Sequence, residues 1–187
     1  METLVIFILA LGLAMDCFAI SISNSSLAGE VKPGIPLKTA IAFAFAHLVL
    51  LFLGHWLGGA IQSMFANIET VIAFIILAVI GSKMIMEAVK RHPKSKVFDI
   101  NEAKVIVVLS LATSMDAFLV GLALGITSMT IVLSGILITI TVFILTLAGI
   151  AGGQQFGIGF TKRVTIFGGI FLLLAALHFL LRFLGAF

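Results

Sequence analysis

The tetrapeptide Met15-Asp16-Cys17-Phe18 places an aspartate in the middle of the apolar run Leu4–Ile22, which holds no other charged residue. The tetrapeptide Met115-Asp116-Ala117-Phe118 does the same within Val105–Ile126, with its aspartate 100 residues further along the chain. A carboxylate at the centre of a membrane helix costs about 2.5–3.5 kcal/mol on insertion scales. Two such costs at matching positions indicate a shared function, and we expect the two aspartates to meet and hold a cation.

The composition is that of a polytopic membrane protein. Of the 187 residues, 61% are apolar and only 10% are charged, whereas a soluble domain carries about 25% charged residues. The formal charge of +3 comes from a few basic residues, mostly in loops, which set the topology in the lipid bilayer and do not indicate nucleic-acid binding. The single cysteine, Cys17, excludes an intramolecular disulfide and a CxxC redox pair.

Six segments are apolar over the roughly 20 residues that a membrane-spanning helix needs. They are Leu4–Ile22, Ala40–Ile61, Ile68–Ala88, Val105–Ile126, Ile131–Ala151 and Val164–Leu184. The sequence therefore predicts an all-α integral membrane protein with six transmembrane helices. The polar stretch Lys90–Lys104 divides it into a first three-helix repeat (1–92), a cytoplasmic linker (93–103) and a second three-helix repeat (104–187), which together make one transport domain.

The basic residues predict an orientation, because cytoplasmic loops carry an excess of lysine and arginine. On an alternating six-helix path, ten of the eleven basic residues fall on one side, including Lys162 and Arg163 in a predicted loop between the fifth and sixth spans. Only Arg182 falls on the other side. We therefore expect both termini outside the cytoplasm. Because each half has three helices, the two halves enter the membrane in opposite directions.

A weak internal similarity supports two inverted repeats. Aligning the two aspartates also pairs Met15 with Met115 and Phe18 with Phe118. Glycines of the second span are loosely matched in the fifth: Gly54, Gly58 and Gly59 by Gly149, Gly152 and Gly153. Inverted-repeat transporters carry their sites near the membrane midplane, at the interface of the repeats. A two-fold axis in the membrane plane would bring both aspartates to a similar depth.

Two neighbouring carboxylates repel each other inside a membrane, and a divalent cation neutralises both. Manganese and magnesium suit carboxylate, carbonyl and water ligands. Thr113 lies three residues before Asp116 on the same helix face, so its hydroxyl, or a carbonyl that it frees, is a further candidate ligand. The alternative is a structural pair, in which each aspartate bonds to a hydroxyl of a neighbouring helix. We favour the metal site because ionisable groups inside membranes are functional by default.

Two more ionisable residues are candidate ligands. His47 lies near the middle of the second span, where an imidazole can ligate a metal, relay a proton or pack as a hydrogen-bonded core residue. Glu87 follows Lys83 by four residues, so the two can pair, and Glu87 is also a candidate entry or exit ligand. We interpret Cys17 as a small apolar side chain rather than a ligand for soft metals.

The chain resembles the MntP family of bacterial manganese exporters, within the LysE-type transporter superfamily. The resemblance covers essentially the whole chain and is carried by three stretches: Gly12-Leu13-Ala14-Met15-Asp16-Cys17-Phe18-Ala19-Ile20-Ser21-Ile22, Gly81-Ser82-Lys83-Met84-Ile85-Met86-Glu87, and Ala112-Thr113-Ser114-Met115-Asp116-Ala117-Phe118-Leu119-Val120-Gly121. It implies export of manganese(II) from the cytoplasm across the bacterial plasma (inner) membrane, with both aspartates essential and Glu87 as a further site residue. Mn²⁺ is then the transported substrate, and no cofactor is implied.

One position departs from the pattern of that family. His47 stands seven residues before Gly54, where the family usually carries a glutamate or glutamine. A neutral imidazole brings no negative charge and a softer nitrogen ligand, which extends the expected range to other first-row divalent ions. It also offers a proton-linked group, should transport be coupled to protons.

Two other functions stay open on the sequence alone. One is a LysE-type exporter of another divalent metal or small solute, and the other is a non-transporting membrane protein with a structural or regulatory role. The helices carry few hydrogen-bonding groups, which favours a small ion as the substrate. An enzyme is not expected, because the sequence has no Ser/His/Asp set, zinc motif or Gly-rich phosphate loop. The oligomeric state, including a homodimer, is left open.

Overall fold

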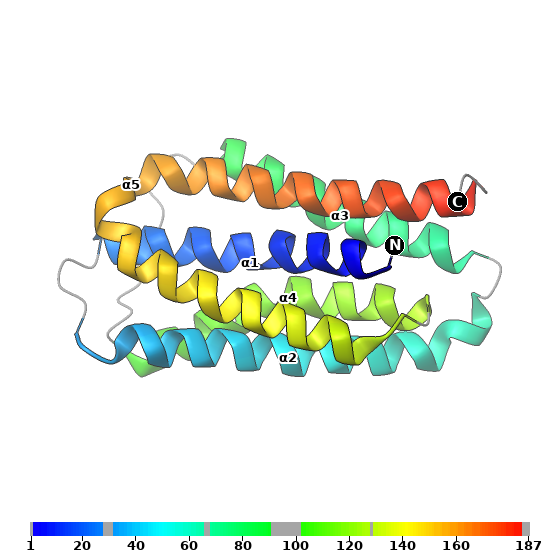
Figure 1. Ribbon diagram of the computed structural model, residues 1–187, viewed down its shortest axis with the longest axis horizontal. Coiled ribbons are helices and arrows are strands. Elements are labelled where there is room, and N and C mark those ends of the chain that lie inside the picture. Colours follow the sequence, from blue (N-terminus) through cyan, green and yellow to red (C-terminus); the bar gives the residue numbers. More distant parts are fainter. Residues whose placement is uncertain (1, 28–31, 66–67, 91–101, 128, 185–187) are drawn as a thin grey trace.

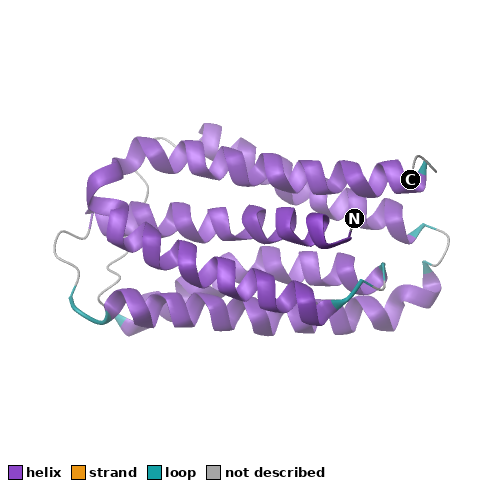
Figure 2. Cartoon of the chain, viewed as in Figure 1, coloured by secondary structure: helices purple, strands orange, loops and turns teal. Residues whose placement is uncertain are grey.

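The computed structural model describes residues 2–27, 32–65, 68–90, 102–127 and 129–184. The elements are α1 (Glu2–Leu27), α2 (Ile35–Ile61), the short 3-10 helix η1 (Gln62–Met64), α3 (Glu69–Lys90), α4 (Ala103–Ile126) and α5 (Ile131–Phe183). Figure 2 shows helices and loops but no strand in these ranges, which confirms the predicted all-α fold. The predicted linker 93–103 lies outside the described residues except for Glu102 and Ala103, where α4 begins.

Within the described residues, six helical stretches are long and apolar enough to cross a membrane, as predicted. They are Thr3–Ser26, Ile35–Met64, Glu69–Lys90, Ala103–Ile126, Ile131–Gly153 and Phe160–Phe183. The first is longer than its apolar run, because polar side chains at its end bond back to the helix. Asn24 Nδ2 donates to the Ile20 carbonyl at 3.1 Å, and Ser26 Oγ donates to the Ser23 carbonyl at 3.0 Å.

The predicted loop between the fifth and sixth spans is wrong. The backbone is helical from Ile131 to Phe183, a run of 53 residues, so Lys162 and Arg163 lie within a helix. Figure 1 shows α5 running along the bundle, turning back near its middle and returning along the bundle. The run contains no proline, so every residue keeps the N–H that a helix needs. The adjacent Gly152 and Gly153 are of the type at which helices bend sharply.

The helices run between two ends of the bundle (Figure 1). At one end lie the C-terminal ends of α1 and α3, the N-terminal ends of α2 and α4, and the turn of α5. We call it the basic end, because the described residues there include Lys32, Lys38, Lys90, Lys104, Lys162 and Arg163. The opposite end, which we call the terminal end, holds the beginning of α1 and the end of α5 with Arg182.

α2 and α4 run parallel with their backbones in contact. Glycines four residues apart on both helices allow this approach: Gly54, Gly58, Gly121 and Gly125. A Cβ atom at Gly54 would collide with the carbonyl oxygen of Phe118, and one at Gly58 with that of Leu122. Small residues at such spacing are typical of close helix pairs in membranes.

α1 contacts both halves of α5. Along the first half, Cβ atoms at Gly149 and Gly153 would lie only 2.9 Å and 3.0 Å from the carbonyl oxygens of Phe18 and Ile22. Along the second half, a Cβ at Gly12 would lie 2.9 Å from Leu172 Cγ. Both contacts are too tight for a larger residue at the glycine, so α1 is held firmly by α5.

α3 packs on the second half of α5 through a reciprocal glycine contact. A Cβ atom at Gly81 would lie 2.9 Å from the carbonyl oxygen of Gly169, and one at Gly169 would lie 2.8 Å from the carbonyl oxygen of Gly81. The next contacts are also reciprocal, since the Gly81 position meets Leu173 and the Gly169 position meets Ile85.

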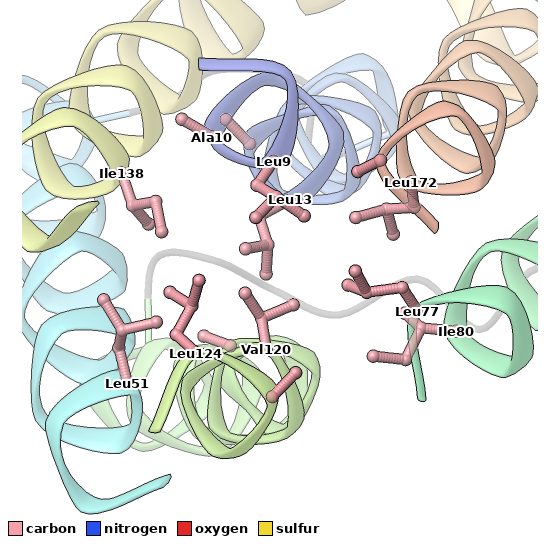
Figure 3. Packing of buried hydrophobic residues seen from close by; sticks show 14 of the residues in the cluster. Leu9, Ala10, Leu13, Leu51, Leu77, Ile80, Val120, Leu124, Ile138 and Leu172 are labelled. Carbon is pink, nitrogen blue, oxygen red and sulfur yellow. The ribbon is translucent and has the colours of Figure 1, made fainter. Parts of the chain in front are cut away.

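A buried apolar cluster fills the bundle toward the terminal end. Figure 3 shows Leu9 and Leu13 of α1 close to Val120 and Leu124 of α4. On α1, α3, α4 and the second half of α5, most of the cluster lies on the terminal side of a polar residue discussed below. Leu9 and Leu13 precede Asp16, Leu77 and Ile80 precede Lys83, Val120 and Leu124 follow Asp116, and Leu172 and Phe179 follow Thr165. The terminal half of the bundle is therefore closed by apolar packing.

Candidate metal-binding site

A polar cavity of about 200 Å³ lies between α1, α3, α4 and α5. Its polar lining residues are Asp16, Lys83, Glu87, Thr113, Asp116 and Thr165. The remaining wall is apolar and is formed by Ile20, Met84, Leu109 and Ala112. The fold thus brings four of the predicted site residues to one cavity, the exception being His47.

The two aspartates reach the cavity from helices in opposite halves of the sequence. The residues that follow them, Cys17 and Ala117, are both fully buried in the apolar cluster. Successive side chains point about 100° apart around a helix, so burial of Cys17 and Ala117 turns the aspartates away from the cluster. Asp116 is only 16% exposed. Both carboxylates are therefore part of the wall of one small chamber.

Two threonines add hydroxyl oxygens to this chamber. Thr113 Oγ1 donates to the Ser110 carbonyl at 3.0 Å, and Thr165 Oγ1 donates to the Thr161 carbonyl at 3.1 Å. Each hydroxyl donates its hydrogen within its own helix. The oxygen can therefore offer only its lone pairs to a ligand in the cavity. Such oxygens complement a cation rather than an anion.

Lys83 carries the ammonium group of the cavity. Its Nζ lies 3.7 Å from Asp116 Oδ1, although the lysine side chain is 57% exposed. A charge-assisted N–H···O hydrogen bond is shorter, at about 2.7–2.9 Å. The ion pair is therefore a long contact between a largely exposed ammonium group and a mostly buried carboxylate. The sequence predicted Glu87 as the partner of Lys83. Asp116 was not predicted as a partner because Lys83 lies on α3 and Asp116 on α4, in different halves of the chain.

Glu87 belongs to two adjoining pockets. It lines the polar cavity, and with Lys83, Met86 and Lys90 it also lines a wider pocket of about 560 Å³. Lys90 is the last residue of α3, at the basic end. The wider pocket therefore extends from the polar cavity toward the basic end, opposite to the closed apolar half.

His47 lies beside the cavity and is not among its lining residues. The imidazole is fully buried, with Nδ1 at 2.9 Å from the Phe43 carbonyl oxygen and 3.1 Å from Ser114 Oγ. The Phe43 carbonyl can only accept, so Nδ1 carries the hydrogen and Nε2 has the lone pair. Nε2 lies 3.4 Å from Cys17 Sγ, whose S–H is then the donor. No pattern in the sequence predicted this pair.

The charges of the cavity favour a cation with more than one positive charge. Three carboxylates face one ammonium group, and the hydroxyl oxygens add lone pairs. Within the described part of the chain, no three His, Cys, Asp or Glu side chains form a ready-made metal cluster. An ion bound here would therefore rely on oxygen from two aspartates, hydroxyls and water, a ligand set that suits hard divalent ions.

These features define the class: a multi-pass helical membrane protein with a small acidic cavity inside the bundle. A family model described as "Mntp: Putative manganese efflux pump" matches residues 30–180. Relatives that bear the name "Putative manganese efflux pump MntP" align over nearly the full length. The protein from Crocosphaera subtropica is 35% identical over 174 residues (93% of both chains). That from Desulfitobacterium hafniense is 34% identical over 185 residues, which cover 99% of this chain and 97% of the relative.

A relative from Methanosarcina barkeri is 36% identical over 174 residues, 92% of both chains. No solved structure matches the chain. The chain belongs to the MntP family of manganese efflux pumps, which are transporters and not enzymes. The resemblance inferred from the sequence is thereby confirmed.

Proposed function

We propose that this chain exports manganese(II) and binds the ion between Asp16 and Asp116. The observation that carries the proposal is that the two lone aspartates of separate apolar helices line one cavity of about 200 Å³. Two carboxylates neutralise a divalent ion, and the Thr113 hydroxyl oxygen is a neutral ligand one turn from Asp116. Glu87 lies on the route from the basic end and attracts the ion toward the site.

We propose further that the two halves are inverted repeats. The glycine contacts support this relation. Gly54 and Gly58 lie 95 residues before Gly149 and Gly153, and their partners Phe118 and Leu122 lie 100 residues after Phe18 and Ile22. The packing of α2 on α4 is thus matched by the packing of α5 on α1. In the first pair the glycine-bearing helix of the offset comparison comes from the first half of the chain, and in the second pair it comes from the second half. Such an exchange is expected of a two-fold axis between the repeats.

The contact between α3 and α5 also supports the proposed two-fold axis. Gly81 and Ile85 each lie 88 residues before Gly169 and Leu173, and the two pairs meet reciprocally. A helix pair that lies on a two-fold axis must contact in this reciprocal way. The third and sixth spans are therefore equivalent elements in the proposed repeat.

One interface breaks the symmetry, and this break supports alternating access. Gly12 of α1 packs tightly on Leu172 of α5. The equivalent of Gly12 is Ala112 of α4, 100 residues later, and the equivalent of Leu172 is Met84 of α3, 88 residues earlier. These two residues line the open cavity instead. The proposed cycle exchanges these two arrangements, so that the α3–α4 interface closes while the α1–α5 interface opens toward the terminal end.

The orientation completes the proposal. Cytoplasmic segments carry an excess of lysine and arginine, so the basic end faces the cytoplasm and both termini lie outside. The cavity in this structure then takes its ion from the cytoplasm, as an exporter of the plasma membrane requires. Protons are the expected replacement for the metal at the site during the return step, which would make the cycle a metal/proton exchange.

The test is manganese accumulation and survival in an exporter-deficient bacterium under manganese stress. Wild type should lower cellular manganese, and Asp16→Asn and Asp116→Asn should each abolish this effect while reaching the membrane. Glu102→Gln is the matched control, because it removes an exposed carboxylate at the start of α4, outside the cavity. Normal export by either aspartate variant would overturn the site.

The same assay examines the sequence-based prediction that His47 contributes to metal choice. His47→Glu should shift the ranking of manganese against cobalt and zinc if the imidazole is a ligand. An unchanged ranking would leave His47 with the packing role that its hydrogen bonds describe.

A further inference from the structure

The cavity holds a positive charge of its own, next to the aspartate that is the proposed ligand. Lys83 Nζ lies 3.7 Å from Asp116 Oδ1. Apolar packing closes the bundle beyond both residues toward the terminal end. A carboxylate in such a place is costly without a cation. The ammonium group of Lys83 lies where it can supply that cation.

We propose that Lys83 is a tethered competitor of the transported ion: its ammonium group neutralises Asp116 in the empty transporter, and a divalent ion must displace it to bind. This inference rests on the proposed function and assigns to Lys83 a specificity-determining role in it. The ammonium group carries one positive charge and the metal ion carries two. Displacement of the ammonium group by the metal therefore neutralises Asp16 and Asp116 more completely.

The geometry suits exchange better than permanent pairing. The contact is longer than a direct hydrogen bond, and more than half of the lysine side chain is exposed. Glu87 lies one helical turn further along α3 and lines the same cavity, so the displaced ammonium remains within reach of a second carboxylate. A lysine that held α3 against α4 would instead be buried, with a short bond to Asp116.

Competition has two measurable consequences. Removal of the ammonium group should tighten metal binding, because the ion no longer displaces a rival. It should also slow the return of the empty transporter, because Asp116 would then change sides without its cation. Manganese–manganese exchange does not require the empty transporter to return. The rate of this exchange should therefore stay at the wild-type value.

The experiment uses the full-length chain, purified and placed in nanodiscs for binding of radiolabelled Mn²⁺ and in proteoliposomes for flux. Lys83→Met should tighten Mn²⁺ binding by about fivefold, the size expected for loss of a partly exposed ion pair. Its net efflux should fall while manganese–manganese exchange stays at the wild-type rate. Lys83→Arg keeps the charge and should restore both binding and net efflux.

Lys104→Met is the matched control, since it removes an exposed lysine at the start of α4 that lines neither pocket. Lys83→Gln is a second neutral variant, so a folding failure of Lys83→Met leaves the comparison intact. Unchanged or weaker Mn²⁺ binding in the folded neutral variants would overturn the competitor role, as would an equal loss of efflux and exchange. Failure of wild type to bind Mn²⁺, or wild-type binding by Asp116→Asn, would instead overturn the proposed function itself.

Discussion

Cys17 Sγ lies 3.4 Å from His47 Nε2, and both side chains are fully buried. Cys17 directly follows Asp16, so the contact fixes the aspartate-bearing turn of α1 against α2. The same imidazole contacts Ser114 Oγ on α4 at 3.1 Å, two residues before Asp116. His47 therefore connects both helices that carry the aspartates, from a position outside the cavity.

His47→Ala is expected to destabilise the protein by about 1–3 kcal/mol, because it removes a fully buried ring together with its contacts to Ser114 and the Phe43 carbonyl. Thermal unfolding followed by circular dichroism at 222 nm measures the effect. Cys17→Ala loses only a weak S–H donor and should shift the unfolding midpoint much less. Equal midpoints for His47→Ala and wild type would show that these contacts do not hold the helices together.

Gly58→Ala should destabilise the α2–α4 interface strongly, because its Cβ would collide with the carbonyl oxygen of Leu122. A collision with backbone cannot be relieved by a rotamer change, so a loss of about 1–3 kcal/mol or more is expected. The neighbouring Gly59 is the matched control, since no heavy atom lies within 4 Å of its Cβ position. Gly59→Ala should therefore unfold at or above the wild-type temperature, and a loss as large as that of Gly58→Ala would contradict the close contact.

A cysteine at position 112 should report the open cavity. Cys17 is the only cysteine, so Cys17→Ala gives a cysteine-free background. In that background Ala112→Cys should react with a small charged methanethiosulfonate reagent from the basic end, and Mn²⁺ should slow the reaction. Ala123→Cys, buried in the apolar cluster at 1% exposure, is the control that should stay unmodified. Rapid modification of both positions would mean that the terminal half is not closed.

Thr113→Val should weaken Mn²⁺ binding by about tenfold, because valine keeps the shape of the side chain and removes its oxygen. Thr113→Ser restores an oxygen at the same place and should bind within about twofold of wild type. Isothermal titration of Mn²⁺ into the purified variants makes this comparison. Wild-type affinity in Thr113→Val would remove the hydroxyl from the ligand set.

Hydrophobicity alone was enough to predict six spans and the all-α class, because each span is a nearly uninterrupted apolar run. It failed at Lys162 and Arg163, where polarity suggested a loop. Charged residues are compatible with a helix when no proline interrupts the hydrogen bonds. In α5 the chain reverses within a continuous helical run, without the loop that was predicted.

The candidate site was predicted in part. Asp16, Asp116, Thr113 and Glu87 line one cavity. The two aspartates could be predicted because a lone charge in an apolar helix is costly unless it faces a polar site. The contacts between distant segments were not predicted. Local spacing gave Lys83 a partner in Glu87, whereas the fold places Asp116 near it, and nothing in the sequence linked Cys17 to His47.

The apolar cluster beyond the cavity also acts as an electrical insulator. All of its residues are apolar, so in the proposed orientation most of the membrane voltage should fall across the packed leucine and isoleucine layer. An ion that reaches Asp16 and Asp116 from the basic end has crossed little of that field. Since one charge moving across 100 mV corresponds to about 2.3 kcal/mol, the voltage dependence of export should reside in the release of the ion rather than in its binding.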